Sequence, residues 1–151
     1  MILIAIKDNV DKNQIITQLN KYFEGKDKPP YKLINKLEKF NSWTPLLIDP
    51  QKYDLEEELI EFLSTKLGST VFGYEHQDTV NLYTIYLYSS GECVDELSTL
   101  DGEISKTYGY FSYLDDLTNE EKSDLDTNEV LEAYYKQLGF DPDYISFEDQ
   151  Y

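Results

Sequence analysis

Residues 80–97 read as a β-hairpin, and a hairpin commits the chain around it to antiparallel pairing. From Val80 to Tyr88 the even-numbered residues would share one face of a strand, and Tyr83, Ile85 and Leu87 the other. Ser89-Ser90-Gly91 supplies a tight turn, and Cys93 to Leu97 forms the returning strand. A strand over 70–74 would precede this hairpin, and Ile104 to Leu114 is a candidate for one that follows it.

Three other segments, 11–24, 55–67 and 127–138, have apolar residues at helical spacing and helix signals at both ends. Each begins near an aspartate that is followed three residues later by Gln or Glu, which is the pattern of a capping box. Each is followed by a glycine, the residue that most readily closes a helix. These positions are Asp11 with Gln14 and Gly25, Asp54 with Glu57 and Gly68, and Asp126 with Glu129 and Gly139.

The remaining patterns complete a single domain. Residues 2–6 are apolar throughout and predict a buried strand, whereas 33–40 suggest a short helix and 43–48 an extended segment that Pro45 interrupts. A chain of 151 residues has the size of one ordinary domain, and no change in composition marks a boundary. We therefore expect one α+β domain over residues 1–151, with an antiparallel sheet packed against about three helices.

The charge of the chain is strongly negative and unevenly distributed. Residues 1–50 hold eight lysines and six acids, a net charge of +2, whereas residues 51–151 hold five lysines and 24 acids, a net charge of −19. All cations are lysines, so no arginine is present to bind phosphate or carboxylate with a bidentate fork. This balance disfavours nucleic acid and membrane surfaces and favours a basic protein partner, although acidity that serves only solubility is an open alternative.

The sequence also suggests where the protein works. A single cysteine, Cys93, allows no intrachain disulfide, which is typical of a reducing compartment. The apolar residues 2–6 are far fewer than the core of a signal peptide, and no run approaches the roughly 20 residues that span a bilayer. We expect a cytoplasmic protein.

No catalytic or metal-binding motif emerges. His76 is the only histidine and lies between two predicted strands, where a turn residue is the simplest interpretation. The acidic residues around Cys93 would raise the pKa of its thiol and disfavour a nucleophile. Asp124, Asp126 and Asn128 match the first ligands of a calcium loop, but Glu129 replaces the required glycine and Tyr135 the required glutamate. We expect no catalytic residue, no metal and no cofactor.

Fourteen tyrosines form the most unusual feature of the composition, and many alternate with acids. Tyrosine is enriched at protein interfaces, and surrounding acids would steer a basic partner toward it; alternatively, inward-facing tyrosines only fill the core. We predict that residues 108–116 and 141–151 form the binding surface. The candidate residues are Tyr113, Tyr144 and Tyr151 as anchors, with Asp115, Asp116, Asp143 and Asp149 steering the partner.

Residues 42–47, 75–78 and 82–92, with the helix between them, resemble small acidic bacterial immunity proteins that neutralise secreted toxins. The resemblance covers about residues 42–97, and its motifs are structural, so no functional residue is carried over. It implies a non-enzymatic binding or inhibitory protein, most plainly an antagonist of a basic bacterial toxin or enzyme. The alternatives are a small enzyme or ligand-binding protein that uses carboxylates in a cleft, and an acidic scaffold subunit.

Overall fold

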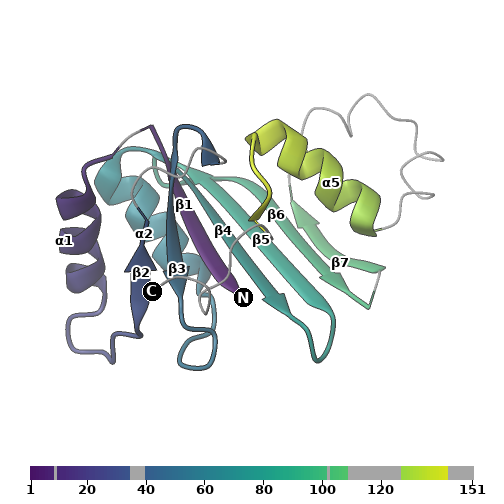
Figure 1. Ribbon diagram of the computed structural model, residues 1–151, viewed down its shortest axis with the longest axis horizontal. Helices are drawn as coiled ribbons and strands as arrows, with labels where there is room; N and C mark the ends of the chain where they lie inside the picture. The colour runs from purple at the N-terminus through teal and green to yellow at the C-terminus, as the bar shows by residue number, and fades with distance from the viewer. Residues whose placement is uncertain (9, 35–39, 102, 109–126, 143–151) are drawn as a thin grey trace.

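The computed structural model describes residues 1–8, 10–34, 40–101, 103–108 and 127–142. Within these residues, a seven-stranded antiparallel sheet packs against helices on both faces (Figure 1). The elements are β1 (Ile2–Lys7), α1 (Lys12–Tyr22), β2 (Tyr31–Leu33), β3 (Trp43–Ile48), α2 (Glu57–Leu67), β4 (Thr70–Gln77), β5 (Leu82–Ser89), β6 (Glu92–Leu100), β7 (Glu103–Tyr108) and α5 (Thr127–Leu138). The predicted α+β class is confirmed, with one helix on the opposite side of the sheet from the other two.

The strand order β2-β3-β1-β4-β5-β6-β7 places β1 inside the sheet. It pairs antiparallel with β3 on one side and with β4 on the other. Residues 2–6 are buried on both faces, which explains why this strand is apolar without alternation. Ile2, Ile4 and Ile6 face α1 and α2, whereas Leu3 and Ala5 belong to the core beneath α5.

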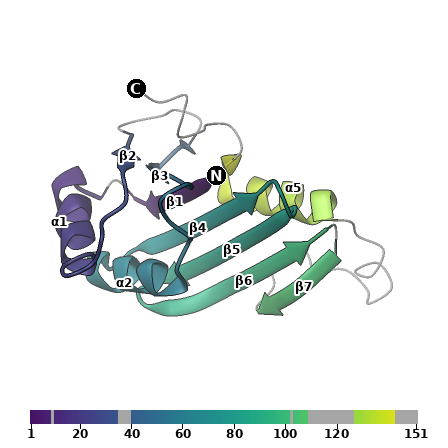
Figure 2. The ribbon, with the colours of Figure 1, turned by 90° about the horizontal axis from the view of Figure 1, so that it is seen from below.

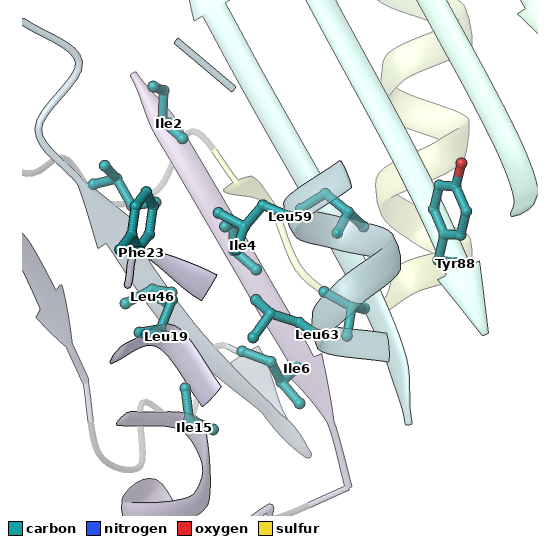
Figure 3. Packing of buried hydrophobic residues seen from close by; sticks show 13 residues of the cluster. Ile2, Ile4, Ile6, Ile15, Leu19, Phe23, Leu46, Leu59, Leu63 and Tyr88 are labelled. Carbon is teal, nitrogen blue, oxygen red and sulfur yellow. The ribbon is translucent and has the colours of Figure 1, made fainter. Parts of the chain in front are cut away.

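The helices make a three-layer arrangement, with the sheet between α2 on one side and α5 on the other (Figure 2). On the α1 and α2 side, Ile15 and Leu19 of α1 and Leu59 and Leu63 of α2 approach the isoleucines of β1 (Figure 3). On the other side, α5 contributes Leu131 and Tyr134 to a core that is rich in aromatic rings. Each helix therefore buries one stripe and leaves its polar side outward.

The predicted hairpin is confirmed. Ser90 and Gly91 both have positive φ, 47° and 89°, as the two-residue turn that matches strand twist requires. Ile85 and Leu87 pack with the α5 core and Tyr86 and Tyr88 with the other, so the two predicted faces are also correct. β6 runs on to Leu100, three residues past the predicted end. Of the strand predicted over 104–114, residues up to 108 belong to β7 and the rest lie outside the described residues.

The short helix predicted over 33–40 is wrong at its start, because Leu33 ends strand β2. β2 pairs with β3, with Leu33 opposite Leu46, and this pairing supplies the backbone hydrogen bonds that a helix would otherwise have made. Residues 35–39 lie outside the described residues. Short apolar runs suit either structure, and the neighbouring strand decides between them.

Pro45 does not interrupt β3, contrary to prediction. Its carbonyl accepts a hydrogen bond from the Ile34 amide on the β2 side, at 3.0 Å. In an antiparallel strand the N–H and C=O of one residue point to the same side. The missing N–H therefore faces the end of the short β2 ladder and costs β1 no hydrogen bond.

The capping box predicted at Asp54 and Glu57 is also wrong. α2 starts at Glu57, two residues later than predicted, and its N-cap Glu56 makes no side-chain capping hydrogen bond. The amide of Leu55 instead donates to the Glu75 carboxylate of β4, at 3.2 Å. The other predicted helix signals largely hold: Asp11 caps α1, Gly68 closes α2 with a φ of 58°, and Gly139 follows α5 with a φ of 88°. Asp126 lies outside the described residues.

Candidate functional site

The segment that leads into α2 and the first turns of the helix carry a dense group of acids, which lies close to three tyrosines. The helix buries Leu59, Ile60 and Leu63, and this leaves the acids of the same segment outward or at the margin of the core. We call this surface the acidic tyrosine face. It comprises Asp54, Glu56, Glu57, Glu58 and Glu61 with Tyr22 and Tyr53, and Tyr88 lies buried directly beneath it.

Two phenols hold two of these carboxylates in place. Tyr22, at the end of α1, donates a hydrogen bond to Glu56 at 2.8 Å. Tyr88, in β5, donates one to Glu57. The two tyrosines come from opposite sides of α2, so adjacent glutamates at the start of one helix are fixed by different elements. A carboxylate held in this way loses less conformational entropy when it meets a partner.

The tyrosines of this face remain protonated at neutral pH. Burial is the first cause that raises the pKa of Tyr22, Tyr53 and Tyr88 well above the ordinary value of 10.0. The charges of Glu56 and Glu57 raise these pKa values further, because a phenolate beside a carboxylate is repelled. The phenols are therefore hydrogen-bond donors, and the negative charge of the face comes from its carboxylates.

Cys93 lies at the inner edge of the same face. Its thiol, Glu57 and Glu96 offer ligand atoms that lie within 4.8 Å of one another, the one such group of three among the described residues. Sulfur with two carboxylates would suit a divalent ion such as zinc, but only after the thiol loses its proton. Burial first, and then the charges of Glu57, Glu96 and Asp95, raises the thiol pKa, so the prediction of a raised pKa is confirmed. A raised pKa keeps the thiol protonated at neutral pH, which disfavours a role as a nucleophile.

His76 lies in β4, not in the predicted turn. Its Nδ1 is 3.1 Å from Asp78, and its ring stacks on Tyr83 with the centroids 3.9 Å apart. On strand β5, His76 pairs with Tyr83 and Cys93 pairs with Tyr88. These two positions are five residues apart, so the histidine and the cysteine are about 16 Å apart along the strand. A catalytic cysteine–histidine pair is therefore not formed.

The predicted binding surface cannot be compared with the structure. All of its candidate residues lie outside the described residues: Tyr113, Asp115, Asp116, Asp143, Tyr144, Asp149 and Tyr151. The acidic tyrosine face was not predicted. Its acids are visible in the sequence as a run from Asp54 to Glu61, but that run was interpreted only as a helix start. The tyrosines that hold it lie 34 and 31 residues from their partners along the chain, a distance that only the fold closes.

Comparison with known proteins adds no relative: no protein-family model, no curated protein and no solved structure matches the chain. Among the described residues, the helices are too short or too polar to cross a membrane. The functional argument therefore rests on the residues of the acidic tyrosine face and on the charge of the chain.

Proposed function

We propose that the protein is a non-enzymatic binding protein that captures a basic protein partner on the acidic tyrosine face. The observation that carries the proposal is the pair of phenol–carboxylate hydrogen bonds at Glu56 and Glu57, which fixes acids at a surface that also offers aromatic rings. In the form suggested by the resemblance to immunity proteins, the partner is a basic bacterial toxin or enzyme, which the complex inhibits in the cytoplasm.

Charge supports this function. The chain carries a net charge of −17, and five acids lie within the eight residues 54–61. A field of this sign accelerates the association of a basic protein and disfavours nucleic acid. The chain's own lysines show that cations settle on the aromatic rings of this region. Lys26 Nζ lies 4.3 Å from the centroid of the Tyr22 ring, and Lys66 Nζ lies 5.8 Å from that of Phe62.

The aromatic rings would supply affinity once the partner arrives. Tyr22 contacts both Phe23 and Phe62, with ring centroids 4.9 and 5.4 Å apart, so the rings are braced by one another. Large rigid side chains of this kind lose little entropy on binding and dominate many interfaces. The acids would act mainly on the association rate and the rings on the lifetime of the complex. The surface predicted at 108–116 and 141–151 remains a second proposed binding site for the same basic partner.

The test is capture of a partner by matched charge-reversal variants. Glu58 and Glu61 on α2 and Glu129 and Glu132 on α5 are exposed acids with the same three-residue spacing on opposite sides of the sheet. The tagged protein, the Glu58→Lys/Glu61→Lys variant and the Glu129→Lys/Glu132→Lys variant would be used as baits in a lysate of the source cells. We expect a basic protein to be captured by the first and third baits and lost from the second.

Two outcomes would contradict the proposal. One is capture of the same protein at equal yield by all three baits, and the other is a captured protein that is itself acidic. Asp11 is unsuitable as a control for charge, because its carboxylate accepts a hydrogen bond from the Asn13 amide and caps α1.

A further inference from the structure

A pocket of about 180 Å³ opens on the α5 side of the sheet, away from the acidic tyrosine face. Its floor is formed where β1 and β5 end and β3, β4 and β6 begin, and the last turns of α5 form its roof. An enclosed cavity of about 150 Å³ is enough to hold a benzene molecule, so this pocket has room for a small organic group. Its lining residues are Lys7, Trp43, Thr70, Leu87, Asp95, Tyr134, Gln137 and Leu138.

The most unusual lining residue is Asp95, a carboxylate on β6 whose residue is only 6% exposed. Tyr134, which is 2% exposed, donates a hydrogen bond to its Oδ2 at 3.3 Å. Burial raises the pKa of Tyr134 well above its ordinary value, with the charge of Asp95 as the next cause, so the phenol stays a donor. A carboxylate withdrawn from water to this extent favours a cation that can reach it.

Two other features of the pocket favour a cation, the C-terminal end of α5 and the face of the Trp43 indole. The C-terminal turn of α5 brings the negative end of the helix dipole, and Leu138 also accepts a hydrogen bond from the Trp43 indole at 3.1 Å. That hydrogen bond fixes the indole as a wall of the pocket. Lys7 Nζ lies 5.8 Å from the centroid of the Trp43 ring, which shows that this wall accepts an ammonium group.

We propose that this pocket binds a single alkylammonium or guanidinium group. The cationic head pairs with Asp95, and its aliphatic stem lies along Leu87, Leu138 and the indole. Lys7, which is exposed at the mouth, competes with the ligand for the indole. The proposal does not depend on the proposed function, because the cation can belong either to a free amine or to a basic side chain of a partner.

The single tryptophan of the chain provides the experiment, since Trp43 lines this pocket and its fluorescence can be excited selectively. The full-length protein would be titrated with n-butylammonium chloride, with n-butanol as the neutral isostere and sodium chloride as the control for ionic strength. We expect a saturable change with butylammonium in the millimolar range and none with butanol or salt. Asp95→Asn should weaken binding at least tenfold, and Lys7→Gln should strengthen it several-fold.

The Lys7→Gln variant keeps the test decisive if Asp95→Asn does not fold, because Lys7 is exposed and outside the core. Equal binding of butanol and butylammonium, a response that does not saturate, or unchanged affinity in Lys7→Gln would overturn the proposal. A Gly-Arg-Gly peptide identifies the source of the cation. Tighter binding of the peptide than of butylammonium indicates that a partner's side chain supplies the cation, and tighter binding of butylammonium indicates a small amine. In both cases the cation binds at this pocket.

Discussion

The two faces of the sheet bury similar amounts of chain in different ways. The face beneath α1 and α2 is mainly aliphatic, and its buried members are Ile2, Ile4, Ile6, Ile15, Leu19, Phe23, Leu46, Ile48, Leu59, Ile60, Leu63, Val71 and Tyr88. The face beneath α5 is half aromatic, with Phe40, Trp43, Phe72, Tyr74, Tyr134 and Phe140 among its buried members. Both faces have buried carboxylates, Glu75 and Glu96 on the first and Asp95 on the second, but only Asp95 lines the pocket beneath α5.

This difference shows how an acidic chain can place charge without losing its core. Around the start of α2, the helix buries its apolar residues and leaves the acids outward or at the margin of the core, where two phenols bind two of them. Beneath α5, a single helix covers the sheet, and the space it leaves is occupied by large rings and a pocket next to a buried carboxylate. The first face is therefore suited to a protein surface and the second to a small cationic group.

The largest expected effects are losses of stability from variants in the two cores, and local amide exchange should distinguish one core from the other. Phe72 contacts the rings of Tyr74, Tyr134 and Phe140, with centroids 5.6 to 6.3 Å apart, so it joins the sheet to α5. Phe72→Ala should lower the free energy of unfolding by about 3–5 kcal/mol, as measured in urea. Amide exchange in α5 should accelerate more than in α1. Ile4→Ala, on the aliphatic face, should cost about 2–5 kcal/mol and show the opposite order of exchange. Equal acceleration of both helices in both variants would contradict two separately packed faces.

A smaller effect compares the two kinds of phenol–carboxylate contact. Tyr134→Phe removes the hydrogen bond to buried Asp95 and should cost about 1–3 kcal/mol, because the carboxylate loses a donor where water is excluded. Tyr22→Phe removes an exposed contact to Glu56, and the loss should stay below about 1 kcal/mol since water replaces it. Thermal or urea unfolding of both variants measures the difference. A costlier change at Tyr22 would mean that the acidic tyrosine face is a structural element.

Alkaline pH should destabilise the protein through the same tyrosines. The pKa values of Tyr22, Tyr53, Tyr88 and Cys93 are raised in the folded state, chiefly by burial. Such groups bind protons more tightly when folded, so their contribution is complete below the unfolded pKa values, about 8.5 for Cys and 10 for Tyr, and is lost as pH rises through the folded ones. The urea midpoint should therefore be constant near neutrality, begin to fall above about pH 8.5 as Cys93 loses its contribution, and fall more steeply above about pH 10. The urea midpoint of the Tyr88→Phe variant should fall less steeply with pH. A midpoint that rises with pH would contradict these pKa shifts.

Local patterns predicted the elements, because their signals lie within a few residues of one another. The hairpin at Ser90-Gly91, the cap at Asp11 and the stop at Gly68 all depend on short-range geometry. The errors occurred where a distant partner decided the outcome. Leu33 joins a strand because β3 is beside it, and the amide of Leu55, just before α2, binds Glu75 of β4, 20 residues further along the chain.

The candidate sites were harder to predict for the same reason. The acids around the start of α2 lie within eight residues of sequence, but the phenols that hold two of them come from α1 and β5. The α5 pocket joins residues from six elements, and Asp95 was interpreted only as part of the acidic surroundings of Cys93. Alternation along β6 puts Asp95 on the same face as buried Leu97, but the burial of that face depends on α5, which lies more than 30 residues further along the chain.

The most direct test of the account is the association rate between the protein and its captured basic partner, measured by stopped flow as a function of salt. The exposed acids of the acidic tyrosine face attract a basic partner over long distances. Charges more than about 10 Å apart are screened at roughly 0.1 M salt, so added salt should weaken this attraction. The account predicts that the rate falls clearly between low and moderate salt. It also predicts that Glu58→Lys/Glu61→Lys slows association at low salt about tenfold more than Glu129→Lys/Glu132→Lys does. A rate that is independent of salt, or equal slowing by the two charge reversals, would contradict a binding surface on α2.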